Sequence, residues 1–524
     1  MKTLLKHHKL AVFLALFLIS SLFSSLFAQK DSIKWGIEQD YLIKGFIGNI
    51  EILKTDSNNI YFYCSAEKAT SWSYFIVKHE KKTGLNSICE IQLKTKEYKL
   101  NLLRRIYSDN TLHIFSTYYN KKLDKLFVFH ETYNTEMMQS NNDIGKLTEI
   151  DYKALAPGGA SLQNLDFEYL NKRFLFRYAC KTKKGQVFGL EVFDRKLTKE
   201  WSNPSIALTE TGVSYEGNYQ IDNEGNVYAL QRNYENEKDV NKHYERSRIW
   251  AACYPKGAGE PKSIALILKD DYFITCKQLS VNEKGEVICA GLYSKPGTTS
   301  AVGCFSFVTE PLLAKIKSVN TKEFSTEMLI KGQDAKMQQK EIMKILSKKD
   351  FDKDFIYTID SIHFRKDGGF NVVIEKYKKE EIVSGNFAAD YYYYDDLWVL
   401  TYYADGSINW VQKIPKYEYI KDFWPVGSYF LSYEKNENMT FIFNLINYRS
   451  SSKSKTVRMT LDKGGKESFM ELAENSNVEQ LILPKILFKQ DDNTLILFRS
   501  SCGSMFEALA GKKNKITFGE LNLK

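Results

Sequence analysis

The chain has 524 residues, of which 43% are hydrophobic, 26% charged and 14% aromatic, and its formal net charge is +9. This composition is that of a globular protein and excludes an intrinsically disordered or low-complexity chain. The excess of positive charge is small and dispersed, without the basic stripe that nucleic-acid binders carry, so we expect no nucleic-acid partner.

The first 28 residues are predicted to be a secretory signal peptide. Three lysines precede an almost wholly apolar run over 10–27, and the small residue Ala28 follows. Cleavage there leaves 70 basic and 64 acidic residues, a net charge of +6. The alternative is an uncleaved anchor, since about 18 apolar residues can just span a bilayer. We expect cleavage, and hence an exported protein, periplasmic or extracellular, with no transmembrane segment in the mature chain.

The rest of the chain repeats one plan, in which a short apolar run, a polar turn and a second β-rich run follow one another. The turns lie 51 to 83 residues apart and centre on Asn59, Asn110, Asn171, Gly225, Gly285, Gly368, Asn438 and Asn493. A second hairpin follows the hairpin at each of the first seven of these turns. Turn residues between β-branched and aromatic runs are typical of hairpins, so each unit reads as four antiparallel strands, A to D.

Four strands repeated about eight times predict an all-β fold, a single β-propeller spanning residues 29–524, with about seven blades as the alternative. Two or three β-sandwiches in series are a further alternative, but the chain has only nine prolines and no Pro- or Gly-rich linker. The eighth unit lacks a fourth strand. We expect Ser32–Gly36 to pair with Phe518–Leu523, closing the ring and protecting an open sheet edge.

One segment, at about 321–349, departs from the β pattern. Its apolar residues between 342 and 346 share one helical face, lysines line another, and Gly332 breaks the pattern. We expect a short helical insertion that docks on the propeller. The alternative is a basic amphipathic helix that binds a membrane.

The eight cysteines do not read as a disulfide framework. Five of them lie inside apolar, strand-like runs: Cys64, Cys180, Cys253, Cys289 and Cys304. Buried thiols behave as small hydrophobic groups, so we expect most cysteines to be free, with one or two disulfides left open. There is no CxxC pair and no paired histidine spacing, so we expect no metal site and no cofactor.

Three tracts carry resemblances to known proteins. VFDRKLTKEW, ending at Trp201, resembles the outer hairpin of PQQ-type propeller blades, which implies that Trp201 docks on the neighbouring sheet. YADGSINW, over 403–410, resembles a sialidase Asp-box but lacks its Ser/Thr and its spacer. The tract from Asp367 to Pro415 resembles uncharacterised exported bacterial proteins of β-propeller-like type, which implies a fold and no activity.

Motifs for catalysis are missing. There is no GxSxG elbow, the residues around Cys502 lack a cysteine-protease pattern, and IDNEGN over 221–226 lacks the late acid of a calcium loop, so it reads as a hairpin turn. Paired carboxylates of a carbohydrate-active hydrolase or lyase are recognised only by their distance, so that enzyme class stays an alternative. A quinone-dependent redox enzyme is a third, weaker reading.

The long loops fall on one side of the predicted blades. A–B and C–D turns lie on one rim, the short-turn rim, while B–C loops and D–A crossovers lie on the other, the long-loop rim. Long excursions of the second class are residues 141–160, 233–246, 321–349, the segment of Tyr391–Tyr394, 447–455 and 502–513. The tyrosine run reads either as a recognition surface or as the start of a strand with alternate tyrosines packed.

Binding residues concentrate on long loops of rigid scaffolds. We therefore expect a monomeric binding or scaffold module that takes a protein or polysaccharide ligand on the long-loop rim, with the short-turn rim as the alternative. The candidate contacts are Tyr234, Tyr244, Arg246, Tyr392, Tyr394 and Arg449.

Overall fold

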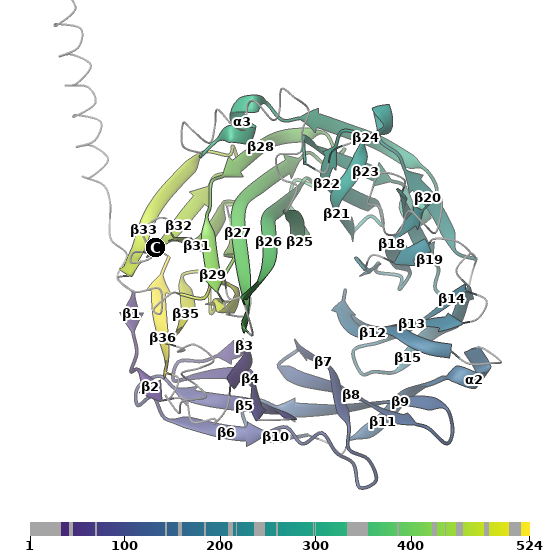
Figure 1. Ribbon diagram of the computed structural model, residues 1–524, viewed down its shortest axis with the longest axis vertical. Helices are drawn as coiled ribbons and strands as arrows, with labels where there is room; N and C mark the ends of the chain where they lie inside the picture. Colours follow the sequence, from purple (N-terminus) through teal and green to yellow (C-terminus); the bar gives the residue numbers. More distant parts are fainter. Residues whose placement is uncertain are drawn as a thin grey trace, which may run out of the picture. The chain divides into compact units, whose positions relative to one another are not determined.

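The described residues form eight antiparallel sheets with four main strands each, and the fold is an all-β, eight-bladed β-propeller (Figure 1). The computed structural model describes residues 33–523 except 41–45, 69–70, 142–143, 156–159, 183–184, 208–212, 216, 235–246, 258–259, 297, 299, 333–354, 385–386, 422–426, 435, 447–453, 476–481 and 502–514. The chain divides into a larger unit, Ile43–Glu80 with Leu85–Lys416, and a smaller unit that contains Lys81–Gly84 and both ends of the chain.

The larger unit holds six blades. Blade 1 consists of β3 (Phe46–Thr55), β4 (Asn59–Lys68), β5 (Ser71–Glu80) and β6 (Asn86–Glu90); blade 2 of β7 (Asn101–Ser108), β8 (Thr111–Asn120), β9 (Lys125–Asn134), the short β10 (Gln139–Ser140) and β11 (Gly145–Asp151); and blade 3 of β12 (Ala160–Leu170), β13 (Arg173–Thr182), β14 (Gly185–Phe193) and β15 (Lys199–Ala207).

Blade 4 consists of β16 (Val213–Tyr215), β17 (Gln220–Ile221), β18 (Val227–Tyr234), β19 (Ser247–Tyr254) and β20 (Lys262–Leu266); blade 5 of β21 (Phe273–Val281), β22 (Val287–Ser294), β23 (Gly303–Thr309) and β24 (Ile316–Glu323); and blade 6 of β25 (Ile356–Phe364), β26 (Phe370–Ser384), β27 (Phe387–Tyr402) and β28 (Ile408–Ile414). Short helical turns are α2 (Tyr152–Leu155), α3 (Thr326–Ile330), η3 (Lys269–Asp271) and η4 (Pro311–Leu313).

The smaller unit holds two blades. Blade 7 consists of β30 (Tyr429–Tyr433), β31 (Met439–Ile446), β32 (Ser454–Leu461) and β33 (Glu467–Asn475), and blade 8 of β34 (Phe488–Lys489), β35 (Thr494–Ser501), β36 (Lys515–Asn522), β1 (Lys34–Trp35) and β2 (Gln39–Asp40); β29 (Glu418–Lys421) and η6 (Pro484–Ile486) also belong to this unit. The N-terminal strand β1 completes the C-terminal blade, because Lys34 pairs with Glu520 and Trp35 with Gly519. The predicted pairing of the two chain ends is confirmed.

Each of the eight predicted A–B turns joins two antiparallel strands at the start of its blade, which in blade 4 are β17 and β18, so these predictions are confirmed. Residues 221–226 show the physical cause. The Asp222 carboxylate accepts hydrogen bonds from the backbone N–H groups of Gly225 and Asn226, both at 2.9 Å, and Gly225 has a φ of +93°. That left-handed conformation favours glycine, and the tract is a hairpin turn.

Successive blades of the larger unit bury apolar side chains against each other. Phe115 of blade 2 stacks on Phe167 of blade 3 with ring centroids 4.0 Å apart, and both side chains are fully buried. Every residue of β22 and of β23 is buried. A sheet covered on both faces selects near-continuous apolar strands rather than alternating ones.

The cysteines behave as predicted within the described part of the chain. All seven described cysteines are free, and six of them are buried: Cys64, Cys180, Cys253, Cys276, Cys289 and Cys304. Burial raises the pKa of the Cys180 thiol to about 11, which keeps it protonated and unreactive. Cys502 lies outside the described residues.

Two segment boundaries differ from prediction. Residues 321–323 belong to β24, and the helix begins only at Thr326, where the Ser325 side chain accepts a hydrogen bond from the Met328 N–H at 3.2 Å. The rest of the predicted helix, 333–349, lies outside the described residues. Residues 145–151, predicted as part of a crossover, form β11, which pairs with β9 as the fourth strand of blade 2.

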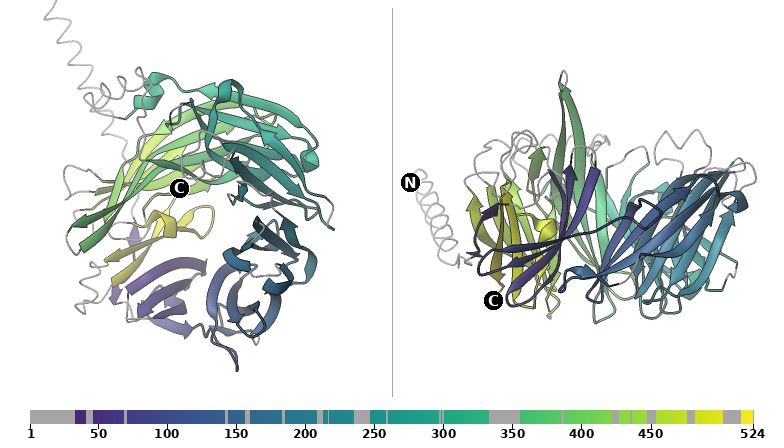
Figure 2. Two further views of the ribbon diagram at one scale, coloured as in Figure 1. Left: turned by 45° about the vertical axis from the view of Figure 1, so that its right-hand side comes forward. Right: turned by 90° about the horizontal axis from the view of Figure 1, so that it is seen from below.

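The tyrosine run lies inside β27, so it belongs to a strand and not to a loop. Strands β26 and β27 pair with each other from the Phe370/Tyr402 pair to the Ser384/Phe387 pair. Their neighbours are shorter, because β25 pairs with β26 only as far as Tyr377 and β28 pairs with β27 only as far as Leu397. The side view shows this green hairpin extending past the other strands of its blade (Figure 2). Among the described residues, no helix is long and apolar enough to cross a membrane.

Candidate functional site

The predicted contact residues are only partly described. Tyr234 is the last residue of β18, and its side chain lies outside the described part, as do Tyr244, Arg246 and Arg449. Tyr392 is half-buried on β27, and its hydroxyl donates a hydrogen bond to the Asp390 carboxylate at 3.2 Å. Only the Tyr392 and Tyr394 side chains belong to the described part of the chain, and the role of the six residues in binding stays a prediction.

Tyr394 is 4% exposed and lies among ionic side chains of blade 6. The Lys416 ammonium is 5.3 Å from its ring centroid and 2.9 Å from a Glu375 carboxylate oxygen. Nearby, Lys413 pairs with Asp396 at 2.8 Å and Lys376 with Asp395 at 3.1 Å. Burial, together with the Asp395 charge, raises the pKa of Asp396 to about 6. Each of these carboxylates is therefore paired with a lysine of blade 6 or, in the case of Glu375, with Lys416 just beyond the last strand of that blade.

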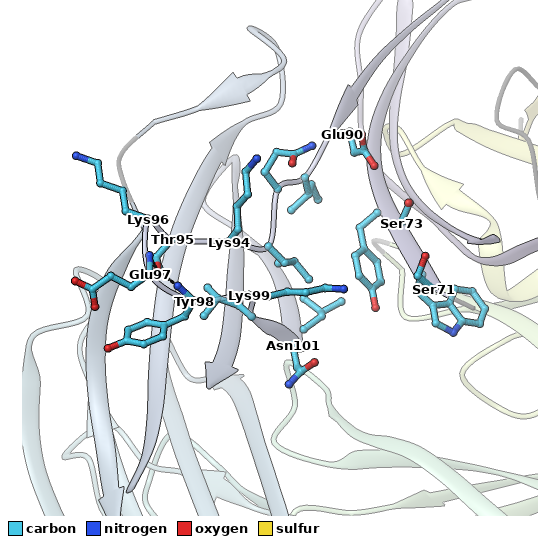
Figure 3. A pocket seen from close by; sticks show the side chains of 17 residues that line it. Ser71, Ser73, Glu90, Lys94, Thr95, Lys96, Glu97, Tyr98, Lys99 and Asn101 are labelled. Carbon is cyan, nitrogen blue, oxygen red and sulfur yellow. Dashed lines mark hydrogen bonds between the residues drawn. The ribbon is translucent and has the colours of Figure 1, made fainter. Parts of the chain in front are cut away.

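A hollow of about 840 Å³ opens on the long-loop rim between blades 1 and 2 (Figure 3). The start of β5, the end of β6, the D–A crossover 91–100 and the start of β7 supply its lining. This volume is within the range of small-molecule and cofactor sites.

The crossover is held in a fixed shape. Lys94 and Lys99 pair as an antiparallel bridge, and the Thr95 hydroxyl accepts hydrogen bonds from the backbone N–H groups of Glu97 and Tyr98 at 3.2 and 2.9 Å. At its two ends, Ile91 and Leu100 are buried. The side chains between these anchors are therefore presented on a small, ordered turn.

Aromatic side chains line the hollow and its edge. Trp72 is 45% exposed, and Tyr74 lies two residues on, so both project from one face of β5. Burial raises the pKa of Tyr74, although the Arg105 guanidinium opposes the shift. On the crossover, Tyr98 stacks on Tyr118 of blade 2 with ring centroids 4.2 Å apart. An exposed tryptophan backed by tyrosines offers a flat apolar surface with polar edges.

Polar groups surround these rings. The lining includes the hydroxyls of Ser71 and Ser73, the amides of Gln92 and Asn101, three lysines of the crossover and two glutamates. The two glutamates, Glu90 and Glu97, lie on opposite sides of the hollow (Figure 3). The arrangement can hold a ligand that has both apolar faces and many hydroxyl groups.

Sequence reasoning missed this site because it followed loop length. The crossover has ten residues and is shorter than the excursions chosen as candidates. A signal was present: KTKEYK, over 94–99, is a lysine- and tyrosine-containing tract between two buried apolar anchors, at a D–A position. The second signal was Trp72, a tryptophan at the connection between strands B and C of the first unit.

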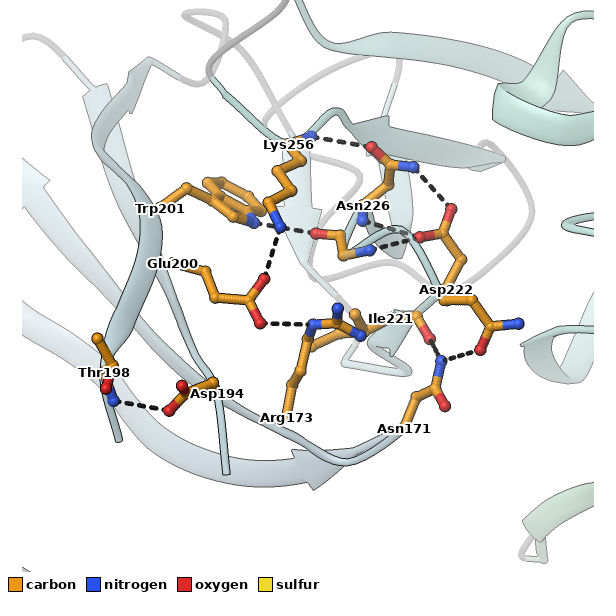
Figure 4. A network of polar contacts seen from close by, with 12 residues as sticks. Asn171, Arg173, Asp194, Thr198, Glu200, Trp201, Ile221, Asp222, Asn226 and Lys256 are labelled. Atoms are coloured by element: carbon orange, nitrogen blue, oxygen red, sulfur yellow. Dashed lines mark hydrogen bonds and ion pairs between the residues drawn. The ribbon is translucent and has the colours of Figure 1, made fainter. Parts of the chain in front are cut away.

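The short-turn rim of blades 3 and 4 has a different character. Glu200 of blade 3 binds Arg173 at 3.0 Å and Lys256 of blade 4 at 2.8 Å (Figure 4). The Trp201 indole N–H donates a hydrogen bond to the Gly225 carbonyl of blade 4 at 2.9 Å. The contact expected for Trp201 is thus present. These polar groups join two blades and are engaged with each other.

A second hollow, of about 430 Å³, lies on the short-turn rim of the smaller unit. Its polar groups are also largely engaged: Thr440 donates to Glu434 at 2.7 Å, and the Arg458 guanidinium donates to the Leu523 carbonyl at 3.0 Å. It is smaller and lacks an aromatic lining residue. In the part of the chain that the structure describes, no group of three or more His, Cys, Asp or Glu side chains is placed to hold a metal ion.

Comparison with known proteins finds a likeness in fold alone. No protein-family model and no curated protein matches it. Among solved structures, it is similar to a polysaccharide lyase (12% identity, TM-score 0.30, 94% of this chain and 98% of that chain). It is also similar to the WD40 domain of SCAP from fission yeast (9%, 0.36, 94% and 98%) and to the β-propeller domain of the Trilobed protease from Pyrococcus furiosus (8%, 0.32, 86% and 98%). Their names cover different activities.

Proposed function

We propose that this protein is an exported, monomeric propeller module that binds polysaccharide at the hollow between blades 1 and 2. The observation that carries the proposal is the exposed Trp72, which lies with Tyr74 among serine and amide groups in an open hollow. Sugar rings have apolar C–H faces and hydroxyl edges. An aromatic surface surrounded by hydrogen-bonding groups matches both features.

Two further observations support the long-loop rim as the ligand face. The site lies between a B–C turn and a D–A crossover, the two connections that define this rim. On the short-turn rim of blades 3 and 4, by contrast, ion pairs and hydrogen bonds between the blades occupy the charged groups. On rigid scaffolds, binding and catalytic residues are found mainly on the loops, where side chains are not engaged in packing.

Trp72→Ala tests this proposal. We expect it to lower the affinity of the mature protein for its polysaccharide by about tenfold or more, since truncation of a central aromatic anchor typically has an effect of this size. A panel of soluble polysaccharides would be screened by affinity electrophoresis, and binders would be measured by isothermal titration calorimetry. The melting temperature should stay close to that of wild type, because Trp72 is largely exposed.

Tyr403→Ala is the matched control, because Tyr403 is an exposed aromatic residue, 51% accessible, in a C–D turn. It should bind like wild type. Equal affinity of the Trp72→Ala variant and wild type would overturn the site assignment. Release of new reducing ends or unsaturated sugars during incubation would favour the hydrolase or lyase alternative over a binding module.

A further inference from the structure

The crossover between blades 1 and 2 carries three lysines, Lys94, Lys96 and Lys99, and all three line the hollow. None of their ammonium groups has a carboxylate within ion-pair distance among the described residues, whereas lysines elsewhere in the larger unit often do, such as Lys125 with Glu149 at 2.6 Å. Three unpaired cations at one hollow form a local positive field. This field is available to a ligand.

The shape of the crossover holds these cations together. The bridge between Lys94 and Lys99 fixes the two backbones side by side, and the Thr95 hydroxyl caps the turn that contains Lys96. Figure 3 shows Lys99 extending toward the strand that carries Ser71 and Ser73. A ligand on the Trp72 surface would therefore lie within reach of this ammonium group.

The two glutamates of the lining weaken the field without cancelling it, because three lysines and two glutamates leave the lining with a charge of +1. Figure 3 shows Glu97 on the side of the crossover that faces away from Ser71, and Glu90 across the hollow beside Ser73. The Lys94 and Lys99 side chains lie between them.

From this geometry we propose that the polysaccharide is anionic, and that Lys94, Lys96 and Lys99 bind its carboxylate or sulfate groups while Trp72 contacts its sugar rings. This inference rests on the proposed polysaccharide-binding function and adds the charge class of the ligand. Exposed ion pairs are individually weak and are screened by salt, so the three lysines act together and mainly at low ionic strength.

The test compares polysaccharide pairs that differ only in charge. Polygalacturonate and its methyl ester probe the carboxylate, and dextran sulfate and dextran probe the sulfate. We expect wild type to bind at least one acidic form about tenfold more tightly than its neutral partner, with an affinity that falls as sodium chloride rises from 50 to 300 mM. The pair that shows the difference identifies which anionic group is recognised.

Two triple variants with the same loss of charge complete the design. Lys94→Gln/Lys96→Gln/Lys99→Gln should lose about tenfold in affinity for the acidic form and should lose most of the salt dependence. Lys172→Gln/Lys196→Gln/Lys284→Gln removes three exposed lysines from turns of the short-turn rim and should bind like wild type. Both variants should melt near the wild-type temperature.

The outcomes separate this inference from the function on which it rests. Equal binding of acidic and neutral forms, with no effect of the crossover variant, would overturn the charge class and leave polysaccharide binding in place. Equal losses in both triple variants would also overturn it, because net charge alone would then explain binding. If no polysaccharide of either class binds, the proposed function itself fails.

Discussion

Two histidines in blade 2 show how burial fixes the charge of single residues. The Nδ1 atom of His113 lies 3.1 Å from the Nε2 atom of His130, and the His113 ring centroid is 4.9 Å from that of Phe174. Desolvation lowers the pKa of His113 to about 4 and that of His130 to about 3, where the His113 charge contributes as well. Both rings are therefore neutral in the folded protein at pH 5 to 7.

This pair predicts a loss of stability in mild acid. Unfolded histidines have a pKa near 6.5, so the unfolded chain binds protons between pH 6.5 and 4 that the folded rings exclude. The loss at pH 5 should be about 2 kcal/mol for each ring. In the His113→Gln/His130→Gln variant, the free energy of unfolding, measured by guanidinium titration at pH 7.5 and pH 5.0, should change less with pH than in wild type.

His363→Gln, at a half-buried histidine of blade 6, is the matched control and should keep the wild-type pH dependence. The same dependence in the double variant as in wild type would show that the pair is not responsible. The burial of both rings could be read from the apolar runs around them. Their contact could not, because it depends on the register that places Phe115 opposite His130.

Strand β1 has only two residues, yet it completes blade 8. The Trp35 ring lies over Gly519, where an added Cβ would come within 2.7 Å of its Cε3 atom, and the Arg499 guanidinium lies 4.3 Å from its centroid. Ile33 and Trp35 also pack on the apolar cluster of the smaller unit. The element therefore covers both a sheet edge and part of a core.

Deletion of residues 29–38 should lower the melting temperature of the mature protein and increase its aggregation, because it exposes the edge of β36 and apolar surface beneath it. Trp35→Ala should lower the free energy of unfolding by about 2 kcal/mol. Ile37→Ala, at an exposed position in the same segment, is the control and should have little effect. Wild-type melting and solubility of the deletion variant would contradict the role assigned to β1.

A single element could be predicted from the sequence where its own residues determine its conformation. The A–B turns were predictable, since Asn, Asp and Gly in turns act locally. Strand β11 was missed because one of its two buried positions is Thr148 rather than an apolar residue. Its hydroxyl donates to Glu191 of blade 3 at 2.8 Å, a tertiary contact that the apolar pattern does not reveal.

For the molecule as a whole, the repeat predicted a propeller of about eight blades, with seven as the alternative, since every unit repeats the same local pattern. The candidate site was predictable only as far as its rim. Its lining joins β5 of one blade to a crossover that leads to the next, so its shape depends on how two blades pack. The length of the connection, ten residues, does not reveal how the two blades pack.

Because apolar contacts join adjacent blades, the stability of each blade depends on the blades beside it. A blade has two apolar faces, and each is buried only because an adjacent blade covers it. Phe167 is fully buried, stacks on Phe115 of blade 2 at 4.0 Å and lies 4.7 Å from Phe176 of its own blade. A cavity at this position would therefore weaken two blades at once.

Phe167→Ala should lower the free energy of unfolding by about 3 to 5 kcal/mol, because it removes a large ring from a packed core. Hydrogen exchange followed by mass spectrometry should show faster exchange in β7, β8 and β9 as well as in β12 and β13, while the strands of blade 6 change less. Phe469→Ala, at a phenylalanine that is 60% exposed on β33, is the matched control and should change stability by less than about 0.5 kcal/mol. Faster exchange confined to blade 3 would contradict the view that blades of the larger unit stabilise one another in pairs.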